Sequence, residues 1–235
     1  MTLVRSIVFA ILFYLWWTIY ALAMLPMLAA PRRWWIGPTR FQARVVTGLL
    51  RYVCDIEVEF RGREHLTSGA VLVAAKHQCM FDTIGPLVLF PDAAYVMRDS
   101  LLRIPFYGWI AVKTGMIPID RQGKASALRR MVAAARACAA EGRQIVIFPE
   151  GTRLPPGAEG QYKPGVAALY RALDLPCTPM ATNSGVHWPP HGLVRRPGRI
   201  VYQLLESIPP GLGRREFMRR LEEETESASA ALLAE

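Results

Sequence analysis

The sequence predicts an α/β fold in which a mostly parallel sheet is flanked by helices and preceded by an N-terminal, membrane-associated segment of two helices. Three features support this prediction: a long uncharged run opens the chain, short apolar runs then alternate with helical patterns, and no linker divides residues 55–235. Strands that alternate with helices require crossover connections, which favour a parallel sheet. We therefore expect a membrane segment over residues 1–54 and one domain over residues 55–235.

The N-terminal run, residues 6–30, contains no charged side chain. As a helix it would be about 37 Å long, compared with about 30 Å for the hydrocarbon core of a bilayer. The run is too long for the apolar region of a signal peptide, and it is apolar on every side, unlike a core helix of a small domain. The sequence predicts a membrane helix and leaves open whether it spans the bilayer or lies half-submerged.

A cationic and aromatic cluster, residues 31–35 (PRRWW), follows this run and is typical of the headgroup level of a membrane. Residues 40–53 then carry Phe41, Val45 and Leu49 at helical spacing, with arginines between them. This pattern predicts an amphipathic helix at the membrane interface, although a surface helix packed on the domain would have the same pattern. The basic flank favours a cytoplasmic position for the chain that follows it.

The formal charge of +9 is concentrated in the N-terminal segment, where six arginines precede the first acid, Asp55. The remaining chain holds 22 basic and 19 acidic residues. This distribution favours an anionic membrane surface as the partner and argues against nucleic acid, which would require clustered basic and aromatic residues in the globular part. The four cysteines stand far apart without a C-x-x-C pair, which argues against a disulfide framework or a zinc site.

The remaining chain alternates strand and helix patterns. Residues 55–61 alternate apolar and charged side chains, as a strand with one wet face does, and the other strands are short apolar runs. The predicted strands are residues 55–61, 70–75, 93–97, 116–119, 144–148, 177–182 and 199–205. The predicted helices are residues 83–90, 106–113, 124–140, 165–173 and 214–233.

Polar clusters follow four of these strands, and functional residues of open α/β sheets gather where strands end. The sequence KHQCMFDT follows residues 70–75, and Asp120-Arg121 follows residues 116–119. PEGTR follows the strand that ends at Phe148, and ATNSG closes the strand that begins at Cys177. Four such ends in one sheet predict a shared site.

The first cluster contains a candidate acid–base pair, His77 and Asp82. Five residues apart on a regular helix, the two side chains could not touch. With His77 on the turn after the strand and Asp82 in the first helical turn, the carboxylate could accept the imidazole N–H and orient the ring as a base. The spacing alone favours a structural alternative, a histidine bonded to nearby backbone with Asp82 as a helix cap. Cys79 lacks a base of its own, so we expect it to fill space.

Arg121, Arg153 and Lys163 are candidate ligands for an anion, because arginine at a strand end suits bidentate phosphate contacts. Gly151 and Thr152 form a tight turn whose amides could contribute. Structural ion pairs with Glu150 or Asp120 are the alternative for the arginines, and residue types alone allow both.

Four motifs in order resemble those of the glycerolipid acyltransferases, in particular the bacterial 1-acyl-sn-glycerol-3-phosphate acyltransferases. Residues 77–82 (HQCMFD) match the H-x4-D box, and residues 115–121 (GMIPIDR) match the second box. Residues 148–153 (FPEGTR) match the third box, and residues 175–179 (LPCTP) with Asn183 match the fourth. An H-x4-D pattern alone is weak, whereas the complete set is specific.

The resemblance implies transfer of a fatty acyl group from an acyl thioester, on coenzyme A or acyl carrier protein, to the 2-hydroxyl of lysophosphatidic acid, giving phosphatidic acid. It implies that His77 is the general base and that Asp82 orients it. It implies that Arg121 and Arg153 bind the phosphate of the acceptor and that Glu150 and Gly151 belong to the same acceptor box. Thr152 and Lys163 complete the expected substrate-binding set on the residue types and positions given above. No cofactor or metal is expected, because a thioester is already activated and the alcohol needs only a base.

The resemblance also implies a place at the cytoplasmic side of a bacterial inner membrane, among the membrane lipids. Family members commonly carry Ser where this chain has Cys79. Another lyso-lipid, such as a lyso-ornithine lipid or a lysophospholipid, remains an alternative acceptor. A non-enzymatic, membrane-anchored anion binder and a thiol hydrolase that uses Cys79 are weaker alternatives.

Overall fold

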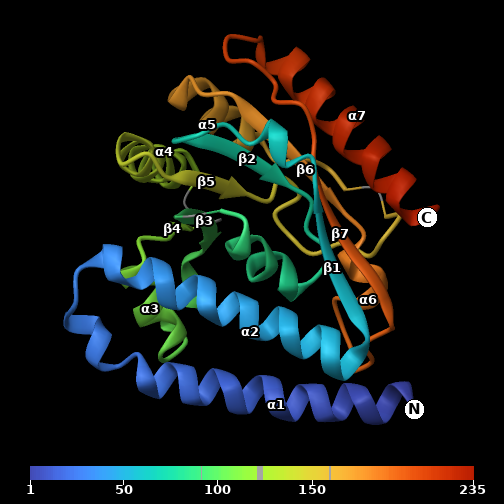
Figure 1. Cartoon of the computed structure of the whole chain (residues 1–235). Helices are drawn as coiled ribbons and strands as arrows, with labels where there is room; N and C mark the ends of the chain where they lie inside the picture. Colours follow the sequence, from blue (N-terminus) through green and yellow to red (C-terminus); the bar gives the residue numbers. More distant parts are fainter. Residues whose placement is uncertain (91, 121–123, 159) are drawn as a thin grey trace.

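The computed structural model describes residues 1–90, 92–120, 124–158 and 160–235 and has the α/β architecture that the sequence predicts (Figure 1). Its seven-stranded sheet has the order β1-β7-β6-β2-β5-β3-β4. Neighbouring strands are parallel except β6 and β7. The strands are β1 Ile56–Arg61, β2 Val71–Ala75, β3 Ala93–Arg98, β4 Ile117–Ile119, β5 Gln144–Ile147, β6 Cys177–Thr182 and β7 Gly198–Leu204. The prediction of a mostly parallel sheet is confirmed.

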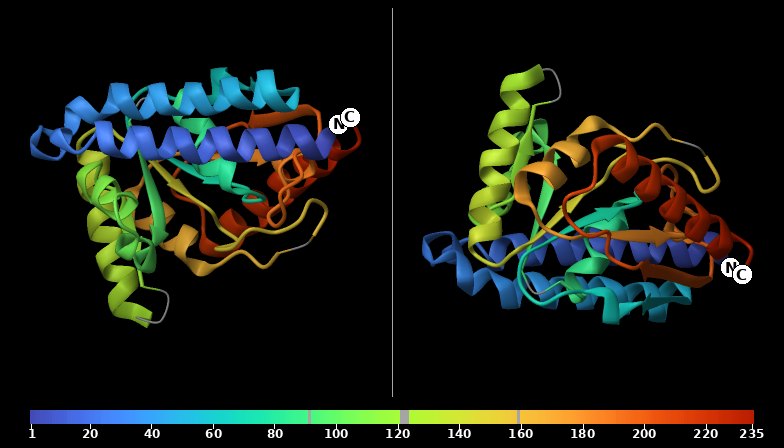
Figure 2. Two further views of the ribbon diagram at one scale, coloured as in Figure 1. Left: turned by 90° about the horizontal axis from the view of Figure 1, so that it is seen from below. Right: turned by 90° about the horizontal axis from the view of Figure 1, so that it is seen from above.

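Helices cover both faces of this sheet. The α-helices are α1 Thr2–Ala23, α2 Ile36–Cys54, α3 Tyr107–Lys113, α4 Lys124–Ala140, α5 Pro164–Leu173, α6 Ser184–His187 and α7 Arg214–Leu233. The short 3-10 helices are η1 Pro26–Ala29, η2 Arg32–Trp35, η3 Arg63–His65, η4 Met80–Thr83, η5 Gly85–Val88 and η6 Asp99–Arg103. The pair α1 and α2 runs antiparallel along one side, and α4, α5 and α7 lie on the other (Figures 1 and 2).

The alternation of β2 shows why the sheet needs helices on both sides. Val71 and Val73 belong to the core on the α2 side, together with Val46 and Leu50 of α2. Leu72, between them, belongs to the core on the side of α4, α5 and α7. Successive side chains of a strand point to opposite faces, so a strand that is apolar throughout must be buried on both.

The predicted helix over residues 83–90 is wrong, because the segment forms two 3-10 turns, η4 and η5, rather than an α-helix. Pro86 lacks a backbone N–H and disfavours the α conformation at Gly85 before it. The side chain of Asp82 also caps the start of η4, which fixes the chain in a tight turn beside the sheet. The turn keeps residues 77–82 close to the ends of β2 and β5.

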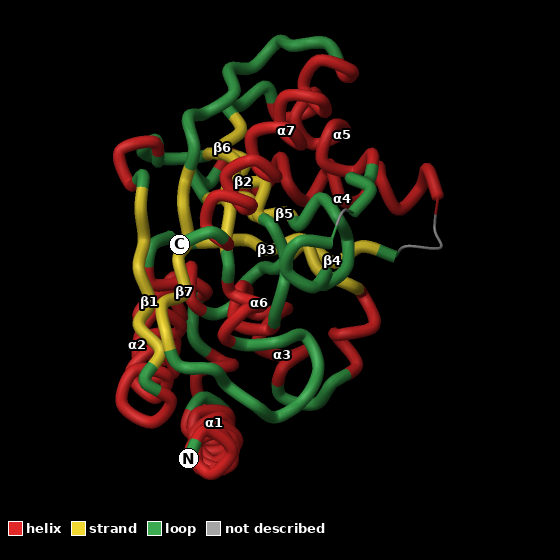
Figure 3. Tube along the Cα trace, turned by 90° about the vertical axis from the view of Figure 1, so that its right-hand side faces the viewer, coloured by secondary structure: helices red, strands yellow, loops and turns green. Residues whose placement is uncertain are grey.

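The uncharged N-terminal run also forms a shorter helix than expected, since α1 ends at Ala23 and Pro26 opens the separate turn η1. Among the described residues, α1 is the one helix that is long and apolar enough to cross a membrane. One stripe of α1 is nevertheless buried against the protein, formed by Ser6, Phe9, Phe13 and Tyr20. Figure 3 shows α1 nearly end-on, lying at the edge of the molecule next to α2. The helix therefore lies along the domain.

Two expectations for the segment after α1 need correction. Arg32 does not face outward, because its guanidinium forms ion pairs with Asp92 at 2.7 Å and Glu141 at 2.8 Å. Trp35 is buried and donates its indole N–H to the carbonyl of Met27 at 3.0 Å. These contacts fix the turn between the two helices, and they leave Arg33 and Trp34 exposed.

The second helix, α2, packs on the domain and is not an isolated interfacial helix. Its buried stripe contains Ala43, Val46, Leu50 and Cys54, all within the core on the α2 side. Phe41 is 56% exposed and lies edge-on to Trp16 of α1. The alternative that the sequence left open, a surface helix packed on the domain, is therefore what the structure shows.

Candidate active site

The site lies at the carboxyl ends of β2, β5 and β6, where the loops after these strands meet. The histidine His77 follows β2 and its imidazole is 15% exposed. Its Nδ1 lies 3.0 Å from Oδ2 of Asp82, whose side chain is completely buried. The same oxygen accepts the backbone N–H groups of Gln78 at 2.7 Å and Cys79 at 2.8 Å. The structure thus shows the predicted pair of His77 and Asp82, and it also shows the cap that belonged to the alternative, because Asp82 bonds both the imidazole and the backbone of the turn.

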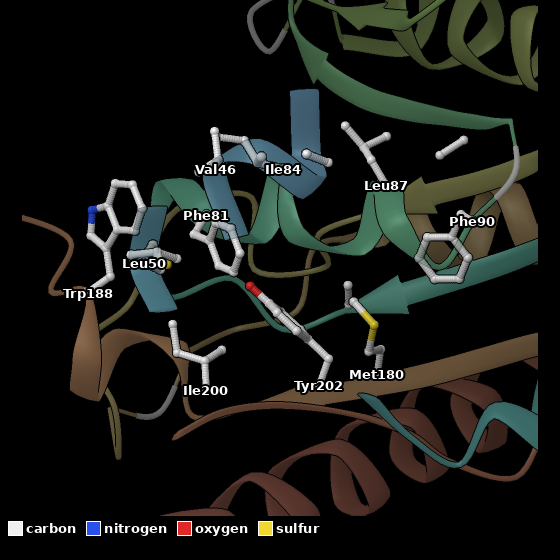
Figure 4. Packing of buried hydrophobic residues seen from close by; sticks show 14 of the residues in the cluster. Val46, Leu50, Phe81, Ile84, Leu87, Phe90, Met180, Trp188, Ile200 and Tyr202 are labelled. Atoms are coloured by element: carbon white, nitrogen blue, oxygen red, sulfur yellow. The ribbon is translucent and has the colours of Figure 1, made fainter. Parts of the chain in front are cut away.

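The second oxygen of Asp82, Oδ1, accepts hydrogen bonds from the hydroxyl of Ser184 at 2.6 Å and of Tyr202 at 3.0 Å. Figure 4 shows the Tyr202 hydroxyl pointing toward Phe81, which is Asp82's neighbour in the chain. Burial raises the pKa of Asp82. The hydrogen bond and charge of His77 lower it, as do the hydrogen bonds from the Cys79 backbone and Ser184, and these effects outweigh burial, so the net shift is downward. A carboxylate kept ionised in this way can only accept, and therefore Nδ1 of His77 carries a proton.

An aromatic stack fixes the plane of the imidazole. The ring of Phe148, directly after β5, lies 4.0 Å from the ring of His77 between centroids, with 19° between the planes. The ring of Tyr95 in β3 stacks on Phe148 in turn, at 6.0 Å between centroids. With its face covered and Nδ1 bonded to Asp82, the ring leaves Nε2 as the nitrogen that can accept a proton from a bound molecule.

Cys79 is fully buried and its thiol lies 3.5 Å from Oδ1 of Asp82. Burial and the charge of Asp82 raise the pKa of this thiol well above its ordinary value. A protonated, inaccessible thiol is a poor nucleophile. The geometry supports the expectation that Cys79 fills space and counts against a thiol hydrolase.

Glu150 does not lie where it could contact a substrate directly, because both oxygens of its buried carboxylate are bonded within the protein. Oε1 accepts from Nζ of Lys76 at 2.9 Å, and Oε2 accepts from the backbone N–H of His77 at 2.9 Å. The sequence grouped Glu150 with the substrate-binding residues, whereas this geometry makes it a support for the histidine. The sequence left open an ion pair between Glu150 and one of the arginines, but in the structure Glu150 pairs with Lys76.

The loop after Glu150 presents the predicted anion ligands to solvent. Gly151 has a φ of 68°, a left-handed conformation that suits glycine, and its N–H bonds to the carbonyl of Phe148 at 3.0 Å. Thr152 and Arg153 are exposed, and the backbone N–H of Leu154 returns to the carbonyl of His77 at 2.9 Å. The loop that carries Arg153 is therefore tied directly to the histidine.

Lys163 is exposed and its backbone N–H bonds to the carbonyl of Pro149 at 2.8 Å. Among the residues that the structure describes, neither Lys163 nor Arg153 forms an ion pair with an acid. Arg121 lies outside the described residues. The exposed Arg98 ends β3 and pairs in register with Ile119, so it reaches the same edge of the sheet.

Sequence reasoning did not assign roles to four residues that the structure brings to this site: Lys76, Ser184, Tyr202 and Glu226. Ser184 lies in the polar cluster that closes β6, so its neighbourhood was signalled by the sequence. Tyr202 lies within β7 and Glu226 within α7, where neither composition nor spacing marks them. In the described part of the chain no three His, Cys, Asp or Glu side chains are grouped to hold a metal ion.

Comparison with known proteins places the chain among acyltransferases. Among curated proteins, the 1-acyl-sn-glycerol-3-phosphate acyltransferase of Pseudomonas aeruginosa is 34% identical over 157 residues, covering 67% of this chain and 61% of that protein. The 1-acyl-sn-glycerol-3-phosphate acyltransferase of Limnanthes alba is 27% identical over 166 residues, covering 70% of this chain and 59% of that protein. The matches thus span about three fifths of each relative.

A crystal structure of the 1-acyl-sn-glycerophosphate (LPA) acyltransferase from Thermotoga maritima has the same fold. The two chains superpose with a TM-score of 0.83 and 20% sequence identity, over 100% of this chain and 99% of that chain. The family model described as Acyltransferase matches residues 57–183, which is more than half of the chain and contains the histidine, the aspartate and the loop after β5. The chain therefore belongs to the acyltransferase family.

Proposed function

We propose that this protein is a membrane-bound enzyme that transfers a fatty acyl group from an acyl thioester to the 2-hydroxyl of lysophosphatidic acid, giving phosphatidic acid. The observation that carries the proposal is the geometry of His77, whose Nδ1 is bonded to the buried Asp82 while Nε2 stays available. The names of the Pseudomonas and Limnanthes relatives support the choice of acceptor. The acyl donor is a thioester of coenzyme A or of acyl carrier protein.

In the proposed mechanism His77 is the general base. The 2-hydroxyl oxygen forms a bond to the thioester carbonyl carbon while its proton passes to Nε2. The tetrahedral intermediate then collapses, the C–S bond breaks, and the imidazolium returns the proton to the departing thiolate. Asp82 stays ionised throughout and stabilises the imidazolium. Because the hydroxyl of the acceptor attacks the thioester directly, the protein forms no covalent intermediate.

The phosphate of the acceptor binds, in this proposal, to cations at the same edge of the sheet. Arg153 and Lys163 are exposed on either side of the loop that is bonded to the histidine backbone. The exposed Arg98, at the end of β3, contributes a further cation to this edge. Arg121 lies outside the described residues, and we propose it as a phosphate ligand from its place in the second motif alone. The hydroxyl of the exposed Thr152 supplies a further donor, and guanidinium groups suit the bidentate recognition of phosphate.

We propose that the protein lies on the cytoplasmic side of a bacterial inner membrane. In this arrangement α1 lies in the plane of the membrane interface. One stripe of α1 is buried against the domain, while its opposite face is apolar and exposed. The exposed apolar residues of α1 are Leu3, Val4, Ile7, Val8, Ile11, Tyr14, Leu15, Ile19 and Leu22. A helix with one face on protein and the other in acyl chains gives a site that meets its lipid substrate without extracting it.

An assay of the purified full-length protein with palmitoyl-coenzyme A and a panel of lyso-lipids tests the acceptor. The panel contains lysophosphatidic acid, lysophosphatidylethanolamine, lysophosphatidylglycerol and a lyso-ornithine lipid, each presented in mixed micelles. Acylation of lysophosphatidic acid at the highest kcat/KM is the expected result. Turnover of another lyso-lipid without turnover of lysophosphatidic acid would overturn this assignment and favour the alternative acceptor.

A further inference from the structure

An ionic cluster centred on a buried lysine is bonded to the backbone of the histidine. Lys76 is the residue before His77, and its side chain, which ends in the ammonium group, is 1% exposed. It is bonded to Oε1 of Glu150 at 2.9 Å and to both carboxylate oxygens of Glu226, at 2.6 and 2.7 Å. All three ammonium donors thus go to carboxylate oxygens, and two of them go to a single residue of the C-terminal helix α7.

The cluster carries one positive and two negative side chains. Burial lowers the pKa of Lys76, but Glu226 and Glu150 outweigh that effect, and the net shift is upward. The ammonium is therefore held charged in the interior. A buried charge is costly unless it is paired and its donors are satisfied, so the position of Lys76 depends on Glu226 as well as on Glu150.

Glu226 also joins two loops of the site. Its Oε1 accepts the hydroxyl of Tyr162 at 3.0 Å, and Tyr162 precedes Lys163 at the end of the loop that carries Arg153. Through Lys76 it holds Glu150, whose other oxygen bonds to the backbone N–H of His77. One carboxylate of α7 is therefore connected to the histidine loop and to the anion-binding loop.

We propose that Glu226 is a positioning residue for His77, acting through Lys76 and Glu150. This inference rests on the proposed function, in which His77 is the general base. Glu226 touches neither the substrate nor the imidazole. It fixes the ammonium that orients Glu150, and Glu150 in turn fixes the backbone from which the imidazole projects. Small displacements of a base relative to the reacting oxygen cause large losses of rate, so the effect appears in kcat.

Kinetics of Glu226→Gln with the preferred lyso-lipid provide the first test. The amide keeps the volume of the side chain but turns an N–H₂ group toward the ammonium of Lys76. We expect kcat to fall about tenfold while the KM values of both substrates change by less than about twofold, the signature of a defect in the chemical step. Glu222→Gln, the same change on the exposed face of α7, is the matched control and keeps the wild-type kcat.

A double-mutant cycle separates positioning from a general loss of structure. Lys76→Met leaves the buried carboxylate of Glu150 and the partly exposed carboxylate of Glu226 without their cation, and we expect a loss in kcat of about a hundredfold. Lys76→Met combined with Glu226→Gln removes one of the two negative charges, so its loss should be smaller than the product of the single losses. Multiplicative losses, or a Glu226→Gln enzyme that matches the Glu222→Gln control, would overturn the proposal.

A spectroscopic readout tests the positioning even when the acceptor assignment fails. Labelling with ¹⁵N-histidine gives four backbone amide signals, one for each histidine. In Glu226→Gln the amide signal of His77 should move, because its acceptor Glu150 shifts, while those of His65, His187 and His191 stay unchanged. An unmoved His77 signal contradicts the proposal independently of any assay, whereas a wild-type protein that acylates no lyso-lipid contradicts only the proposed function.

Discussion

At the scale of single residues, the buried carboxylate of Asp82 is the group on which the site depends. One side chain accepts hydrogen bonds from the imidazole of His77, two backbone amides and two hydroxyls. These donors explain why its pKa lies below the ordinary value despite complete burial. The ionised form both fixes the turn η4 and sets which nitrogen of His77 carries the proton.

Asp82→Asn should lower kcat/KM by about 10²- to 10⁴-fold, because the amide cannot hold the imidazole in the same tautomer or stabilise its charged form. Steady-state acylation of the preferred lyso-lipid measures this loss. Thr83→Ala, which removes a neighbouring hydroxyl bonded only to the carbonyl of Met80, serves as the control. Equal activities of the two variants would contradict the role of Asp82.

The same carboxylate predicts how stability depends on pH. Its pKa in the folded protein lies below the ordinary value of 3.8, so its ionisation stabilises the fold above about pH 3.8 and this contribution is lost as the pH falls through the folded pKa. The gap in unfolding free energy between wild type and Asp82→Asn should therefore be larger at pH 7 than at pH 3. Denaturant titrations at the two pH values measure the gap, and a gap that grows on acidification would contradict the prediction.

At the scale of elements, one tryptophan packs between α1 and the turn that follows His77. Trp188, which follows α6, packs edge-on against Phe9 of α1 at 5.3 Å and against Phe13 at 5.7 Å. Its other face stacks on Phe81 of η4 at 5.8 Å (Figure 4). The N-terminal helix is also fixed by the hydroxyl of Ser6, which accepts the backbone N–H of Arg195 at 2.8 Å. Helix α1 and the turn η4, which contains Asp82, thus belong to the same hydrophobic cluster.

Trp188→Ala should destabilise the fold by about 3–5 kcal/mol, because it opens a cavity between α1 and η4. Activity should fall as well, since Phe81 loses the ring against which it packs. Tyr52→Ala is the control, because Tyr52 of α2 is 89% exposed and its removal leaves no cavity. Denaturant midpoints and kcat measured side by side test this prediction, and similar stabilities of the two variants would refute it.

The elements also show how far sequence reasoning reaches. The bounds of α4 and α7 match the predicted ranges, and each predicted strand is present, because hydrophobic periodicity is a local property. The turn at residues 80–88 was missed because Gly85-Pro86 and the cap from Asp82 override the helical pattern. The pair His77 and Asp82 could be predicted because both lie in one motif. Tyr202 and Glu226 could not, since the fold alone brings β7 and α7 to that motif.

At the scale of the whole molecule, α1 lies along one side of the domain (Figures 1 and 2). The residues of the site follow the carboxyl ends of β2, β5 and β6. Not every arginine of the N-terminal segment is available to an anionic membrane surface, because Arg32 forms ion pairs with Asp92 and Glu141. The exposed face of α1, together with the exposed Trp109 and Val112 of α3, is the surface that we expect to contact lipid. Under the proposed function, this surface would let the lipid substrate stay in the bilayer during the reaction.

Ile11→Asp combined with Leu15→Asp should release the protein from vesicles of phosphatidylglycerol and phosphatidylethanolamine in a flotation assay. The two side chains are 61% and 53% exposed on α1, so the change affects lipid contact and leaves the core intact. Leu233→Asp, a change of the same kind at the end of α7, should float with the vesicles as the wild type does. Vesicle binding that survives the α1 substitutions would contradict the in-plane arrangement.

The most direct test of the central claim is the yield of phosphatidic acid from lysophosphatidic acid and an acyl thioester, measured by mass spectrometry for the wild type, Cys79→Ala and His77→Ala. The account predicts that Cys79→Ala keeps most of the activity and that His77→Ala loses about 10²- to 10⁴-fold, the usual contribution of a general base. The opposite ranking, an active His77→Ala enzyme beside an inactive Cys79→Ala enzyme, would contradict it.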